Sequence, residues 1–117
     1  MTTQLGKELK KLRIDLGITL MEMANQIKVS AAFLSSIETG RKRVPDHFLD
    51  TLASNFEAVA QQRSKYEVLI NQARQDVRLT FNGSNKVDAE LATALARRFG
   101  SLSPEEKEQL MRIVEEQ

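Results

Sequence analysis

The first half of the chain carries apolar residues at helical spacing. Between Gln4 and Leu16 they follow one another at intervals of three or four residues, the pattern of an amphipathic helix with one buried face. Gly17 comes next, and glycine commonly takes the left-handed conformation that ends a helix. The spacing therefore predicts a helix over residues 4–16. Its expected core residues are Leu5, Leu9, Leu12 and Leu16.

Two shorter helices are predicted by their start signals. Thr19 and Glu22 stand three residues apart, the spacing of a capping box in which each side chain bonds the other residue's backbone N–H. Ser30 is placed to cap a third helix, which Gly40 ends. The inward residues expected of the two helices are Met23, Ala24, Ile27, Leu34 and Ile37.

Helical spacing resumes after the basic segment of residues 41–43. Pro45 is expected in the first turn of a fourth helix, where a backbone N–H is not needed. A longer helix is predicted over about residues 58–75. The core faces expected of these two helices consist of Phe48, Leu49, Leu52, Ala53, Phe56, Tyr66, Leu69, Ile70 and Ala73.

The spacing of apolar residues changes at Val77. From there to Phe81 apolar and polar residues alternate, which predicts a short strand. Asp88 is expected to cap a helix that runs to about Phe99. Ser103, followed by a proline and then by glutamates, is a strong start signal for a last helix.

Composition supports a helical protein with an aliphatic core. Hydrophobic residues make up 41% of the chain and aromatic residues only 5%, and glycine and proline are scarce. We expect a mainly α fold in two regions. Residues 1–75 would form the first domain, and residues 76–117 would hold the strand and two further helices.

The residue types present argue against several functional classes. The chain contains no cysteine, which excludes disulfides and thiolate metal sites. It begins without the apolar segment of a secretory leader and has no run long enough to cross a membrane, so we expect a cytoplasmic protein. A single histidine, without a glycine-rich phosphate loop or a nucleophile elbow, favours a non-enzymatic role. No metal ion or other cofactor is expected.

Charge is distributed unevenly along the chain. Residues 1–45 carry eight Lys and Arg against four Asp and Glu, a net charge of +4. Residues 46–117 carry nine against twelve, a net charge of −3. A basic front half suggests that one end of the protein faces a polyanion.

Residues 17–45 combine the helical and the electrostatic signals. Two short helices joined by a tight turn, and followed by cations, are the pattern of a helix-turn-helix. A helix about 10–12 Å across fits the major groove of DNA. Its first N–H groups and its dipole favour a nearby phosphate, as do the cations of the following loop.

A set of residues across this region also resembles a known family. The set comprises Leu9, Leu12, Arg13, Gly17, Ile18, Thr19, Met23, Ala24, Val29, Ser30, Leu34, Ser35, Ile37, Glu38, Gly40, Arg41, Pro45, Leu52 and Ala53. It is similar to the lambda-repressor-like, or Xre-type, helix-turn-helix proteins over about residues 5–56. The resemblance implies a five-helix domain whose third helix reads double-stranded DNA.

The resemblance also implies roles for individual residues. The residues it directs toward the bases are Ala31, Ala32, Ser35 and Ser36. The residues it places at DNA phosphates are Thr19, Lys28, Arg41, Lys42 and Arg43. It pairs Arg13 with Glu38 in a structural ion pair between the first and third helices.

Two features depart from the family pattern. Residue 20 is Leu, where the family usually has Gln in contact with DNA. The reading face lacks Arg, Gln and Asn, so the strong bidentate pairings with bases are not available from it. Specificity would then rest on thymine methyl contacts, on DNA shape, or on the flanking residues Gln26, Lys28 and Thr39.

We therefore expect a transcriptional repressor that binds a palindromic operator as a homodimer. The strand residues Val77, Leu79 and Phe81 would pair with the same strand of a second copy, because an unpaired strand leaves backbone groups unsatisfied. The alternative is an antitoxin or other interaction module, whose second half binds a partner protein such as a toxin or a protease.

Overall fold

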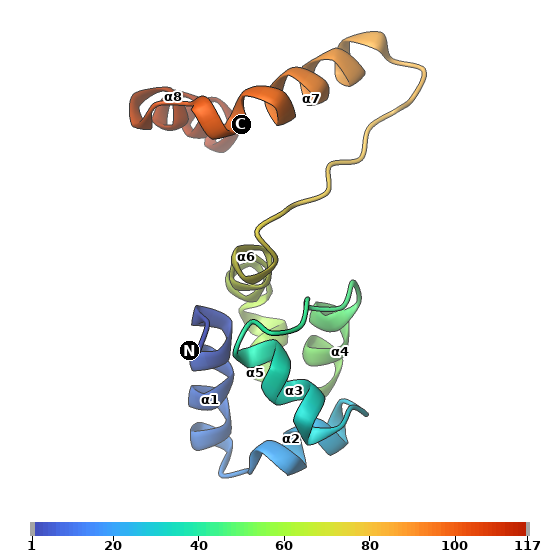
Figure 1. The fold of residues 1–117 in the computed structure, drawn as a ribbon, viewed down its shortest axis with the longest axis vertical. Helices are drawn as coiled ribbons and strands as arrows, with labels where there is room; N and C mark the ends of the chain where they lie inside the picture. The colour runs from blue at the N-terminus through green and yellow to red at the C-terminus, as the bar shows by residue number, and fades with distance from the viewer. Residues whose placement is uncertain (1, 117) are drawn as a thin grey trace. The chain divides into compact units, whose positions relative to one another are not determined.

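A computed structural model describes residues 2–116 of the chain (Figure 1). The chain divides between Val77 and Arg78 into two compact units. Both units are built from helices. Among the described residues, no helix has the length and apolar character needed to cross a membrane.

The amino-terminal unit is a bundle of short helices (Figure 1). Its elements are α1 (Gln4–Leu16), α2 (Leu20–Gln26), α3 (Ala31–Glu38), α4 (Phe48–Asn55), α5 (Glu57–Gln61) and α6 (Arg63–Arg74). The predicted start signals of α2 and α3 are confirmed. Thr19 and Glu22 form the capping box, and the Ser30 hydroxyl accepts a hydrogen bond from the N–H of Phe33. Gly17 ends α1 in the left-handed conformation, with φ 68°.

One aliphatic core holds these helices together. It consists of Leu5, Leu9, Leu12, Met23, Ala24, Ile27, Leu34, Ile37, Val44, Phe48, Leu52, Phe56, Val59, Tyr66 and Ile70. α6, the last helix of the unit, packs against both α1 and α4 and so covers one side of the core. Burying a side chain of this size contributes about 1.5–3 kcal/mol, so the helices are stabilised chiefly by packing rather than by their own propensity.

Glu38, at the end of α3, joins α3 to α1 in two ways. Its carboxylate accepts two hydrogen bonds from the Arg13 guanidinium, at 2.6 and 3.1 Å. Its carbonyl accepts from the backbone N–H and the hydroxyl of Thr3, at 2.9 and 3.0 Å. The approach is close enough that a Cβ on Gly6 would lie 2.4 Å from the Glu38 carbonyl oxygen. The ion pair that the resemblance implied is therefore present and largely buried, with side chains 11% and 9% exposed.

Several expectations about the amino-terminal unit are wrong in detail. Leu16 is 48% exposed, because α1 ends at this residue and the chain turns toward α2. α4 begins at Phe48 rather than at Pro45, whose carbonyl accepts from the N–H of Phe48 and from a side chain of α6. The long helix expected after residue 58 is interrupted at Gln62, where φ and ψ leave the helical region.

The carboxyl-terminal unit contains α7 (Lys86–Arg98), a 3₁₀ turn η1 (Phe99–Ser101) and α8 (Pro104–Glu115). Asn85, and not the expected Asp88, caps α7 by accepting from two backbone N–H groups. The start of α8 is confirmed as a capping box between Ser103 and Glu106, with Pro104 in the first turn.

The strand predicted at Val77–Phe81 is not formed. Over residues 2–116 every regular element is a helix, and Val77, Leu79 and Phe81 are exposed. The alternation of apolar and polar residues is a local signal, whereas a strand needs a partner to satisfy its backbone groups. The described part of the chain offers no second strand, so the segment runs as an extended connection.

The helices of the carboxyl-terminal unit have no buried residue. Their large apolar side chains are mostly more than half exposed. These are Val87, Leu91, Phe99, Leu110, Met111, Ile113 and Val114. Within this unit, the two helices therefore leave most of their apolar side chains uncovered.

Replacing Glu38 with Ala should strongly destabilise the amino-terminal unit. The change leaves the largely buried Arg13 guanidinium without its carboxylate, and breaking a buried pair costs about 3–5 kcal/mol. Urea unfolding measures the loss. Glu116→Ala removes the same charge from an exposed position and should change the free energy of unfolding by no more than about 0.5 kcal/mol. Equal, small losses in the two variants would show that the ion pair does not secure α3.

Candidate nucleic-acid interface

α2 and α3 form a helical pair joined by a tight turn (Figure 1). Lys28 adopts a left-handed conformation in this turn, with φ 62°. The N–H of Val29 then donates a hydrogen bond to the carbonyl of Ala24, at 3.0 Å. The core residues of the pair all point to one side, so the opposite side of α3 is left facing outward.

The outward face of α3 is made of small side chains. Ala32 is exposed, and Ser35 and Ser36 are half-buried. The Ser36 hydroxyl donates to the carbonyl of Ala32 at 2.9 Å, which draws it against the helix. Ala31 is also half-buried and packs against the core. Ala32, Ser35 and Ser36, three of the four residues expected at bases, thus form one surface of small side chains. Ala31 lies at the margin of this surface.

The residues expected at phosphates lie on both sides of this surface. Lys28 is exposed in the turn before α3, and Arg41 and Lys42 are exposed in the loop after it. Thr19 is exposed as well, although its hydroxyl already accepts the N–H of Glu22 at 3.0 Å. The face of α3 is therefore flanked by cations at both ends.

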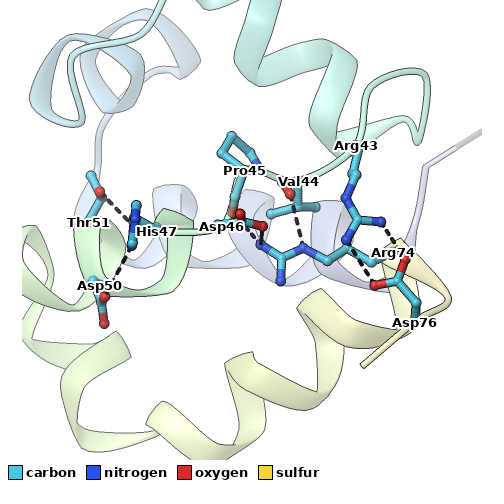
Figure 2. A network of polar contacts seen from close by, with 9 residues as sticks. All are labelled: Arg43, Val44, Pro45, Asp46, His47, Asp50, Thr51, Arg74 and Asp76. Carbon is cyan, nitrogen blue, oxygen red and sulfur yellow. Dashed lines mark hydrogen bonds and ion pairs between the residues drawn. The ribbon is translucent and has the colours of Figure 1, made fainter. Parts of the chain in front are cut away.

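The loop after α3 is held in place by Arg74, the last residue of α6. Figure 2 shows the guanidinium of Arg74 directed at the loop backbone, where it donates to the carbonyl of Val44 at 3.0 Å and to that of Pro45. A weaker ion pair reaches Asp46 at 3.9 Å. The Val44 side chain is buried beneath. The loop that carries the cations is thus held to the core by Val44 and to α6 by Arg74.

Arg43 differs from the other loop cations because it is already paired. Its guanidinium donates two hydrogen bonds to the carboxylate of Asp76, at 2.5 and 2.9 Å (Figure 2). This hydrogen bonding raises the pKa of Arg43 above its ordinary value. Arg74 and Asp76 were missed at the level of sequence, because they lie some 30 residues from the loop and no local spacing connects them to it.

A family model described as a helix-turn-helix domain matches residues 4–65 of the chain. The match spans α1 to α5 and the start of α6, and so includes the helical pair and the cationic loop. It agrees with the family resemblance seen in the sequence. No curated protein and no solved structure gives a significant match.

Replacing Arg74 with Ala should loosen the loop after α3. The substitution removes charge-assisted hydrogen bonds to two carbonyls from a side chain only 14% exposed, and such bonds contribute about 1.5–3 kcal/mol. Amide hydrogen exchange over residues 41–47 should accelerate, and the free energy of unfolding should fall.

Arg63→Ala is the matched control for this variant. Arg63 also belongs to α6, but it is half exposed and pairs with Asp50 at the surface, so its loss should leave exchange in the loop unchanged. Unaltered exchange in the Arg74 variant would mean that packing of Val44 alone positions the loop.

Proposed function

Because the chain belongs to the helix-turn-helix domain family, we propose that it is a DNA-binding transcriptional regulator, and more narrowly a repressor that acts as a homodimer on a palindromic operator. One observation carries the proposal. The outward face of α3 is free of bulky side chains and has cations in the turn before it and in the loop after it.

The shape and charge of this region suit a DNA groove. A single helix fits the major groove, and small side chains let its backbone approach the base edges closely. Lys28, Arg41 and Lys42 can reach phosphates on either side of the helix, which supplies affinity without sequence preference. Thr19 stands at the amino end of α2, where N–H groups and the helix dipole favour a further phosphate.

The reading face limits how sequence can be recognised. Ala32 can contact a thymine methyl, and the serine hydroxyls can bond several base edges. Because the Ser36 hydroxyl hydrogen is directed at the Ala32 carbonyl, its oxygen is left to accept from a base amino group. Few direct contacts are available, so the operator is selected in large part by the shape and flexibility of the DNA.

A dimer is required because one helix-turn-helix reads only a few base pairs. Repressors of this design place two copies on half-sites about 34 Å apart. We assign the contact between copies to the exposed apolar faces of α7 and α8. Both helices leave large apolar side chains exposed, and a second copy related by a twofold axis can cover them.

The rival function is that of an antitoxin or interaction module. The observation that favours it is the same apolar surface, since α7 and α8 could cover a different protein instead of a second copy. The two functions differ in a simple respect. The repressor is a dimer when purified alone, whereas the interaction module remains monomeric until a toxin or protease partner is added.

Ala32→Glu should abolish binding to duplex DNA and leave the fold intact. The new carboxylate would enter the groove beside the phosphates, while Ala32 is exposed and its replacement disturbs no core contact. Selection of bound sequences from random DNA, followed by titration of the selected duplex, measures the effect. Ala60→Glu places the same charge on an exposed position of α5 and should bind within about threefold of the wild type, or about 0.7 kcal/mol. Equal binding by both variants would remove α3 from the interface.

Leu91→Arg should dissociate the dimer. Leu91 is 66% exposed on α7, and a buried cation facing its own copy is strongly unfavourable. Sedimentation should show dimer affinity reduced at least about tenfold, roughly 1.4 kcal/mol. Thr93→Arg changes an exposed residue on a different side of the same helix and should dimerise normally. A wild-type chain that sediments as a monomer at every concentration would favour the interaction module.

A further inference from the structure

Arg43 stands in the cationic loop beside the reading helix, yet it is already paired with a carboxylate. Two of its N–H groups are directed at the two carboxylate oxygens of Asp76 (Figure 2). A DNA phosphate presents two oxygens to arginine in the same forked geometry. The carboxylate of Asp76 therefore occupies Arg43 in the way that a phosphate would.

The position of Asp76 is fixed by the fold. α6 ends at Arg74, which is bonded to the backbone of Val44 and Pro45 in the same loop. Gln75 then turns the chain in a left-handed conformation, with φ 67°, and delivers Asp76 to Arg43. The way α6 is tied to the loop thus places Asp76 within reach of Arg43.

The pair is also accessible to a competitor. The side chains of Arg43 and Asp76 are 53% and 55% exposed, so water and ions reach both. Exposed ion pairs contribute little net stability, because solvent screens the attraction. A polyanion that presents many phosphates can displace one carboxylate at little cost to the fold.

We propose that Asp76 is an internal competitor of DNA, which withholds Arg43 from phosphate and so weakens the sequence-independent part of DNA binding. The proposal rests on the proposed function and adds a residue that regulates the same interface. Arg41 and Lys42 contact phosphates from the first encounter, whereas Arg43 does so only after it leaves Asp76. The displaced carboxylate then remains beside the DNA backbone and repels it.

The test is Asp76→Asn in the full chain, with a labelled random-sequence duplex as the probe. Removing the carboxylate should tighten binding and steepen the dependence of log K on log salt by up to about 0.9, the contribution of one additional phosphate contact. Between about 50 and 200 mM salt, the gain over the wild type should shrink by about 3.5-fold, since the salt concentration changes fourfold.

Two controls separate competition from a simple change in net charge. Glu67→Gln removes one negative charge from an exposed site on α6 and should give a smaller gain without a steeper salt dependence. In an Arg43→Gln background, Asp76→Asn should give only the gain seen with Glu67→Gln. The gain specific to Asp76 is expected to vanish there, because the group that it restrains is gone.

The outcomes distinguish this proposal from the proposed function. If the wild type binds DNA and Asp76→Asn gains no more than Glu67→Gln, the competition is refuted while DNA binding stands. The same holds if the gain persists without Arg43, or if Asp76→Asn weakens binding, since Asp76 would then position Arg43 for phosphate. A wild type and a variant that both fail to bind duplex DNA at low salt overturn the two proposals together.

Discussion

The contact between Glu38 and α1 is the interaction on which the arrangement of the amino-terminal unit depends. Through its carboxylate and its carbonyl, a single residue at the end of α3 binds both Arg13 and Thr3. Apolar burial supplies the main driving force for packing α3, but the hydrophobic effect itself carries no direction. Directional bonds to two points of α1 fix the rotation of α3, and with it the face that points outward.

The surface around α3 is shaped by a second set of directional contacts. Arg74 fixes the backbone of the loop, so the exposed Arg41 and Lys42 project from a rigid support. Arg43 comes from the same support but meets an acid supplied by the end of α6. The net positive charge of the front half is thus an incomplete guide to its electrostatics, because a residue beyond residue 45 neutralises one of its cations.

Local signals in the sequence predicted most of what is local in the structure. The spacing of Thr19 and Glu22, and the position of Ser30, locate the starts of α2 and α3 because caps depend on residues three apart. The ion pair between Arg13 and Glu38 followed from the family resemblance, since no rule of spacing links residues so distant. Where distant parts of the chain decide the outcome, prediction failed. Pro45 lies before α4, in a loop that Arg74 binds from α6, and within residues 2–116 the alternating segment after residue 76 has no strand to pair with.

The two sides of α3 differ in how far they contribute to the stability of the fold. Leu34, Ile37 and Glu38 are buried and fastened, and the chain leaves no room for a side chain at Gly6 opposite them. Ala32 is exposed, and Ser36 is half-buried outside the apolar core. Substitutions on the buried side therefore lower the free energy of unfolding, and selection removes them. Substitutions on the outward side change the free energy of unfolding little. The outward surface of α3 can accordingly change through single substitutions, without compensating changes in the rest of the unit.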